Sequence, residues 1–173
     1  MSNGEFFIER WEAEYAPTLR VLRAVPAARL DYRPHPRSRS AGELVALLVS
    51  EEQAGIELCQ TGEVQWNEPK GFPTLEEMVA AYERHHQTLA EQLKKLDDTM
   101  WNRKAKFFVG GIPVIEETVG GLFWIALFDA VHHRGQLSAY LRPMGGKVPS
   151  IYGPSADDAG NQHGKYLRPP VAV

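Results

Sequence analysis

The sequence predicts an all-α protein: a four-helix bundle with a small β-hairpin before the last helix. Three observations carry this prediction. Four long segments repeat apolar side chains every three to four positions, capping boxes open two of them, and a pair of glycines interrupts one short apolar run. With 173 residues the chain is long enough to bury one core of its own, so we expect residues 1–173 to form a single domain.

The helices are expected over residues 5–23, 40–60, 74–97 and 118–142. Pro17 lies inside the first segment, and because proline removes a backbone donor we expect a kink or an early break there. The second helix begins with a capping box between Ser40 and Glu43, and the third with one between Thr74 and Glu77.

The connections between these helices differ in length. Residues 61–73 read as a polar loop, whereas residues 107–114 (FFVGGIPV) predict a hairpin with its turn at Gly110-Gly111. Connections of this length permit a crossover topology rather than simple up-down-up-down order. After the last helix, residues 147–173 are rich in turn formers and are expected to wrap the surface.

Composition excludes several classes of function. A net charge of −3 and a pI near 6.1 give no basic face for nucleic acid, and the apolar stretch at residues 120–128 is too short to cross a membrane. The N-terminus MSNGEFFIERW lacks the basic and apolar regions of a signal peptide. The single cysteine, Cys59, excludes an internal disulfide and is expected to be a small buried side chain. We therefore expect a cytoplasmic protein.

Titratable groups lie on the apolar stripes of the last three helices. Glu51 falls on the stripe of the second helix, His86 on that of the third, and Asp129 and His133 share one face of the fourth, together with Gln136. These positions are close to the helix midpoints, so they would meet at similar heights in a bundle. Because a charge in an apolar interior is costly unless it is paired, three interpretations stay open: a hydrogen-bonded polar core, a metal site, or metal-free acid–base chemistry.

The fourth helix has a second apolar face, and a helix that is apolar on two sides also packs against another chain when nothing in its own fold covers it. This face predicts a homodimer. Its residues are Phe123, Trp124, Leu127, Phe128 and Val131.

At the end of that helix the sequence HHRGQLSAYLRPMGG (132–146), with FD before it and KVPSIYGPSAD after it, resembles the C-terminal signature of the DinB/YfiT-like metalloenzyme superfamily. RPHPRSRSAGELVALL resembles the link and second helix of the same family. The resemblance implies an up-down-down-up bundle that is commonly dimeric. It also implies a divalent metal, zinc or nickel, held by one histidine from the second helix and a His-x-x-x-His pair from the fourth. Characterised relatives include thiol-dependent transferases and isomerases.

Matched residue by residue, the chain departs from that pattern twice. His133 matches the histidine before Arg-Gly-Gln, but Asp129 stands four residues earlier in place of the other, and Leu47 stands at the position on the second helix. Helical geometry offers Glu51, one turn beyond Leu47, as a substitute. A set of Asp129, His133 and Glu51 would suit manganese, iron, nickel or zinc. His86 would be a fourth ligand or would orient a carboxylate.

Two functional hypotheses follow. In the first, a divalent metal acts on a small molecule in a central pocket by thiol transfer, isomerisation or hydrolysis, with Glu51 or His86 as candidate general bases and Gln136 bonded to a ligand or bound water. In the second, the site holds no metal and has become a polar core in a non-catalytic, ligand-binding dimer. Arg134 is expected to form a salt bridge that stabilises the helix or the tail. Gly135 is expected where another backbone approaches closely.

Overall fold

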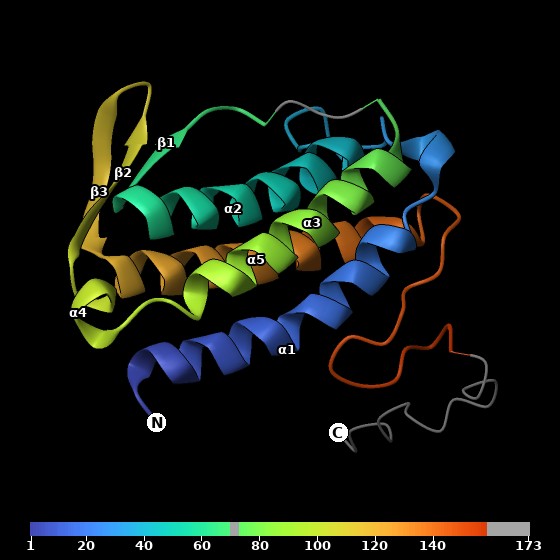
Figure 1. Ribbon diagram of the computed structural model, residues 1–173. Coiled ribbons are helices and arrows are strands. Elements are labelled where there is room, and N and C mark those ends of the chain that lie inside the picture. The colour runs from blue at the N-terminus through green and yellow to red at the C-terminus, as the bar shows by residue number, and fades with distance from the viewer. Residues whose placement is uncertain (70–72, 159–173) are drawn as a thin grey trace, which may run out of the picture.

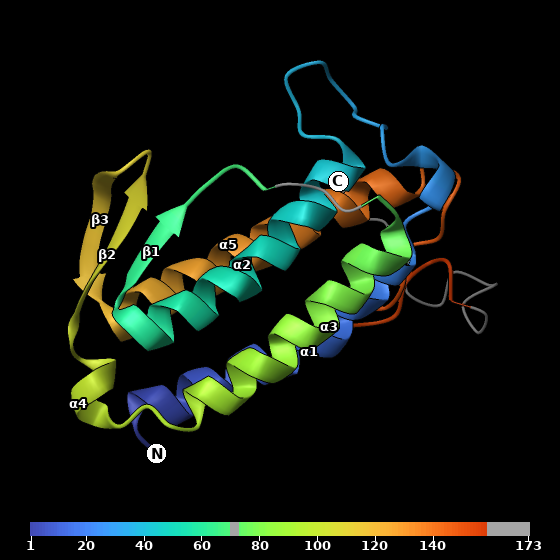
Figure 2. The ribbon, with the colours of Figure 1, turned by 45° about the horizontal axis from the view of Figure 1, so that its top comes forward.

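The computed structural model describes residues 1–69 and 73–158, which form four long helices and a small sheet (Figure 1). The helices are α1 (Asn3–Arg23), α2 (Ala41–Thr61), α3 (Leu75–Leu93) and α5 (Val119–Leu141). α1 and α5 run in one direction while α2 and α3 run in the other, so the order is up-down-down-up, as the family resemblance implies (Figures 1 and 2). α1 and α2 each pack against both α3 and α5.

The helix starts follow their capping boxes. Ser40 with Glu43 opens α2 and Thr74 with Glu77 opens α3, as predicted. A third box, between Ser2 and Glu5, starts α1 two residues earlier than expected. α1 runs through Pro17 without the predicted break. The carbonyl that loses its partner there belongs to Ala13, which is exposed to water.

The third helix is shorter than predicted. It ends at Leu93, and a separate short helix, α4 (Asp98–Trp101), follows with Asp97 as its N-cap. The Asp97 side chain accepts a hydrogen bond of 2.8 Å from the backbone of Met100. Because Asp97 caps a new helix, it does not extend the old one.

The sheet has three strands, β1 (Glu63–Trp66), β2 (Lys104–Val109) and β3 (Ile112–Thr118), in that spatial order. β2 and β3 form the predicted antiparallel hairpin, and both turn residues, Gly110 and Gly111, have positive φ (59° and 78°). β1 pairs with β2 in parallel, which corrects the prediction that residues 61–73 are a loop. The sheet stands beside the end of α2 and the start of α5 (Figure 2).

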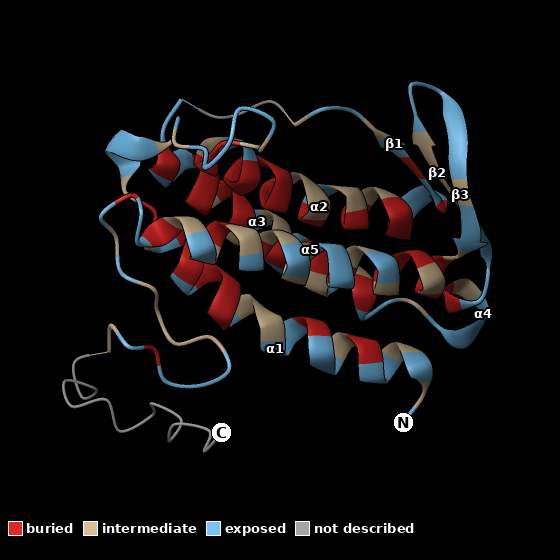
Figure 3. Ribbon diagram, turned by 180° about the vertical axis from the view of Figure 1, so that it is seen from behind, coloured by how far each residue is buried: buried red, intermediate tan, exposed pale blue. Residues whose placement is uncertain are grey.

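Buried side chains line the inner faces of the helices, while much of the hairpin is exposed (Figure 3). The second apolar face of α5 is largely covered within the chain: the ring of Phe123 lies 5.3 Å from that of Phe7 and 5.9 Å from that of Trp101. Phe128 is the exception, with 66% of its surface exposed. The homodimer therefore stays a prediction. Cys59 is buried as expected, and burial raises the pKa of its thiol to about 12.

The described part of the tail returns along α1. Val148 and Ile151 pack against the core, and Arg20 donates a hydrogen bond of 3.0 Å to the carbonyl of Ser150. The rest of the predicted wrapping tail, residues 159–173, lies outside the described residues. Within residues 1–69 and 73–158, every helix is too short or too polar to cross a membrane.

Candidate metal centre

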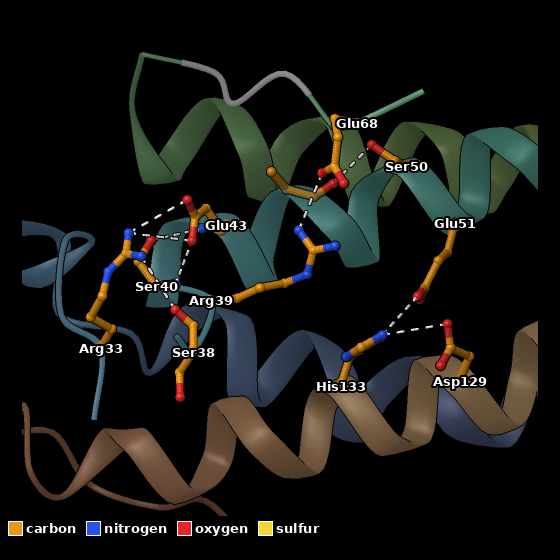
Figure 4. Close-up of polar contacts among 11 residues, drawn as sticks. Arg33, Ser38, Arg39, Ser40, Glu43, Ser50, Glu51, Glu68, Asp129 and His133 are labelled. Atoms are coloured by element: carbon orange, nitrogen blue, oxygen red, sulfur yellow. Dashed lines mark hydrogen bonds and ion pairs between the residues drawn. The ribbon is translucent and has the colours of Figure 1, made fainter. Parts of the chain in front are cut away.

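Three of the predicted site residues meet between α2 and α5. Ligand atoms of Glu51, Asp129 and His133 all lie within 4.8 Å of one another (Figure 4). Nε2 of His133 is 3.4 Å from Oδ2 of Asp129 and 3.9 Å from Oε1 of Glu51. Asp129 and His133 project together because they are one helical turn apart on α5, and Glu51 faces them from the middle of α2. The proximity predicted from helical spacing is confirmed.

Glu51 is the buried acidic residue of this cluster. Its side chain is 10% exposed, and both carboxylate oxygens are buried with no hydrogen-bond partner among residues 1–69 and 73–158. Burial raises its pKa well above the usual range, and the neighbouring charges of Asp129 and Glu52 raise it further, against a smaller lowering by Arg39. A buried carboxylate of this kind requires a proton or a cation.

Gln136 fixes the orientation of His133. Its Oε1 lies 3.0 Å from Nδ1 of His133, so with the amide oxygen facing the ring Nδ1 is the donor. The lone pair then falls on Nε2, the nitrogen that faces both carboxylates. Gln136 was predicted to bond to a ligand or bound water. The structure shows its contact with the imidazole, which prepares His133 for a ligand role, and a hydrogen bond from Gln136 to a ligand or bound water stays a prediction.

The donor set fits a divalent ion. Two carboxylates and one neutral imidazole supply two negative charges and three donor atoms, a composition suited to manganese, iron, nickel or zinc. The partnerless carboxylate of Glu51 supports this fit, because a cation would satisfy the oxygens that no donor of the described chain reaches.

A cavity of about 330 Å³ opens beside the cluster, between α2, α5 and the sheet. Glu51, Asp129 and His133 line it, and so does Leu47, which confirms that Leu47 and Glu51 lie on the same face of α2. Small residues leave room for it: Ala54 on α2 and Ala126 on α5 are also in the wall. A volume near 300 Å³ is at the lower end of the range for small-molecule sites.

His86 does not join this cluster. Its Nδ1 lies 3.4 Å from Oε1 of Glu52 and its Nε2 lies 3.4 Å from Oε2 of Glu12, and the rings of Trp11 and Tyr15 stack on it at 4.0 and 3.9 Å. Both ring nitrogens and both ring faces of His86 therefore contact residues outside the cluster that contains His133. Glu52, which sequence reasoning missed, differs from Glu51 by one position, or 100° around α2, and that rotation turns it from α5 toward α3.

Arg134 forms the predicted link to the tail. It is 1% exposed and donates to Glu14, Thr18 and the hydroxyl of Tyr152. The next residue, Gly135, is exposed, and no atom of the described residues beyond its own turns of α5 lies within 4 Å of where a Cβ would stand. The expected close approach of another backbone at Gly135 was therefore wrong.

Solved structures of other proteins share the overall fold. A DinB-like protein from Bacillus cereus is 22% identical over 86% of this chain and 97% of its own, with a TM-score of 0.69. A DinB-like protein (YjoA) from Bacillus subtilis is 16% identical over 88% of this chain and 98% of its own, with a TM-score of 0.63.

YfiT from B. subtilis, described as a probable metal-dependent hydrolase with an unusual four-helix bundle topology, is 15% identical over 82% of this chain and 87% of its own, with a TM-score of 0.63. At these identities the likeness is one of fold. No curated protein matches the chain. The DinB family model, however, matches residues 1–164, and the chain belongs to the DinB family.

Proposed function

We propose that this protein is a metal-dependent enzyme that acts on a small molecule in the cavity between α2, α5 and the sheet, with Glu51, Asp129 and His133 holding the ion. The buried, partnerless carboxylate of Glu51 beside two further donor groups carries this proposal. Among thiol transfer, isomerisation and hydrolysis, we favour hydrolysis, which is the reaction class named for YfiT.

A divalent ion at this cluster would supply Lewis-acid chemistry, polarising a carbonyl and lowering the pKa of water. The side chains around the ion would orient its ligands and transfer protons. Gln136 holds His133 with Nε2 toward the carboxylates. Glu51 has two oxygens, so one would hold the ion while the other accepts a proton from water or bound substrate. The largely apolar walls of the cavity would pack against the rest of the substrate.

The test is the metal content of protein purified without an affinity tag. We expect a near-stoichiometric divalent ion (zinc, nickel, manganese or iron) that is lost in Glu51→Gln, Asp129→Asn and His133→Ala. Glu57→Gln is the matched control, because Glu57 lies on the same helix but accepts from the backbone of Gln65 outside the cluster. Wild-type protein that binds none of these ions after incubation with each would contradict the proposal.

A second candidate function is a non-catalytic bundle whose former metal site is now a polar core. The observation that favours it is Leu47, a buried side chain without a donor atom where the family places a histidine. In this alternative His133 and the two carboxylates stabilise one another without an ion, and the cavity binds a ligand without transforming it. Metal content separates the two candidates.

A further inference from the structure

The cavity beside the candidate metal centre has a second polar feature, the guanidinium of Arg39. Arg39 directly precedes Ser40, the N-cap of α2, and it lines the same cavity as Glu51 and His133. Figure 4 shows its guanidinium beside α2, turned toward the space that Glu51 and His133 also face. Among the described residues that line the cavity, Arg39 is the only lysine or arginine.

The present partner of Arg39 holds it weakly. Nη1 lies 3.3 Å from Oε2 of Glu68, and the two side chains are 40% and 78% exposed. An exposed pair of this kind contributes at most about 1 kcal/mol and exchanges readily with another anion. A guanidinium also presents paired donors that match a carboxylate or another oxyanion. Arg39 is therefore available to a ligand that enters the cavity.

The other walls of the cavity are apolar and partly aromatic. They come from all three layers around the cavity: Leu47 and Leu58 on α2, Trp66 and Phe107 on the sheet, and Leu122 and Phe123 on α5. The ring centroids of Trp66 and Phe107 lie 5.8 Å apart with an interplanar angle of 29°, so two aromatic rings lie together in this wall. Such a surface favours a flat apolar body and offers it few hydrogen bonds.

The charges of the lining residues also favour a ligand that carries a negative group. With a divalent ion held by the carboxylates of Glu51 and Asp129, the charges at the cluster cancel, and Arg39 is the remaining charge among the described lining residues, paired only with the exposed Glu68 outside the lining. We propose that the cavity selects small molecules with an apolar, ring-bearing body and an oxyanionic group, and that Arg39 binds that group. This inference rests on the proposed function, because it places the reacting end of the ligand at Glu51, Asp129 and His133.

The experiment compares two fluorescent probes that share one aromatic body. 1-Anilinonaphthalene-8-sulfonate carries an anionic group, and N-phenyl-1-naphthylamine lacks it. Both are titrated into the full chain, once loaded with zinc and once treated with a chelator. In the loaded protein we expect Arg39→Gln to weaken the sulfonate probe by about tenfold, as the loss of a charge-assisted hydrogen bond does, and to change the neutral probe less than twofold.

Three control variants locate the effect. Arg33→Gln removes a nearby arginine that pairs with Glu43 and does not line the cavity, so neither probe is expected to respond. Glu68→Gln frees Arg39 and is expected to strengthen the sulfonate probe about twofold. Ala54→Phe fills the cavity and is expected to weaken both probes, with circular dichroism checking that each variant is folded.

Two results would overturn the proposal: an Arg39→Gln variant that binds both probes as the wild type does, or an Ala54→Phe variant that still binds them. Failure of the proposed function looks different. In that case no metal binds, while discrimination between the probes still depends on Arg39 in the chelator-treated protein.

Discussion

The partnerless carboxylate of Glu51 predicts that the metal-free protein is destabilised by one of its own site residues. In the folded state this carboxylate is buried beside Asp129, and Nε2 of His133 lies 3.9 Å from its Oε1, beyond hydrogen-bond reach. In the unfolded chain water solvates it. Glu51→Gln removes the charge and keeps the shape, so we expect the metal-free variant to be more stable than the wild type at neutral pH.

The same observations give the sign and the size of the change in the free energy of unfolding. A raised pKa in the folded state means that the protonated form is favoured there. The stability associated with it is fully present below the unfolded pKa of about 4.3 and is lost as pH rises through the folded pKa. An unsatisfied buried charge costs somewhat more than the 1–3 kcal/mol of a neutral group, and the amide retains part of that cost, so we expect a gain of about 2 kcal/mol. For a chain of this size that corresponds to roughly 4–8 °C in Tm.

The assay is thermal unfolding of chelator-treated protein at pH 7.5 and at pH 4.5, with Glu57→Gln as the control for a carboxylate that already has a donor. The gain should be largest at pH 7.5 and small at pH 4.5. With metal present the order should reverse, because the wild type then gains the binding energy of the ion. A metal-free Glu51→Gln variant less stable than the wild type at pH 7.5 would refute the reasoning and support the polar-core alternative.

Three further predictions concern the last helix. Arg134→Met removes the ion-pair partner of Glu14, which is 22% exposed and keeps the Tyr152 hydroxyl as a donor, and should cost roughly 1.5–3 kcal/mol in urea unfolding. It should also speed proteolysis of the tail, which Arg134 holds through Tyr152; unchanged proteolysis would contradict that link. Gly135→Ala should stabilise the exposed helix by about 1 kcal/mol, and a loss of stability would indicate a contact outside this chain. If α5 forms a homodimer, Phe128→Arg should halve the mass by light scattering, whereas a monomeric wild type would refute the dimer.

The features that sequence analysis predicted are those with local causes. The boxes at Ser40 and Thr74 start helices because both partners are three residues apart, and the turn at Gly110-Gly111 needs two positive φ angles that glycine adopts freely. Asp129 and His133 were paired by helical periodicity alone. The topology came from the family signature, since connection lengths only permitted a crossover.

The features that it missed depend on contacts between distant segments. β1 is four residues long and pairs with β2 more than 40 positions later, so residues 63–66 carry no signal that separates them from a loop. His86 was placed correctly in the core, but its partners, Glu52 and Glu12, come from two other helices. A stripe on a helix gives the direction in which a side chain points, and only the packing of the bundle decides which residue it meets.

The antiparallel arrangement of α2 and α5 explains how a metal site can persist with Leu47 in place of the family histidine. One turn forward on α2, from Leu47 to Glu51, advances the donor by about 5.4 Å toward the level of Asp129, which lies one turn back from His133 on α5. In the proposed metal site the donor set is thus shifted along the cavity, and both Leu47 and Glu51 line its wall.

This relation predicts the behaviour of a restored family pattern. Leu47→His combined with Asp129→His, with Glu51 left in place, should supply three imidazoles to the same cavity. Because nitrogen donors favour zinc and nickel over manganese, the double variant should bind zinc more tightly relative to manganese than the wild type does, measured by competition against a chelator. Each single variant is the control, with circular dichroism confirming the fold. A double variant with the wild-type preference would mean that position 47 does not reach the ion, and the shifted donor set would then need another explanation.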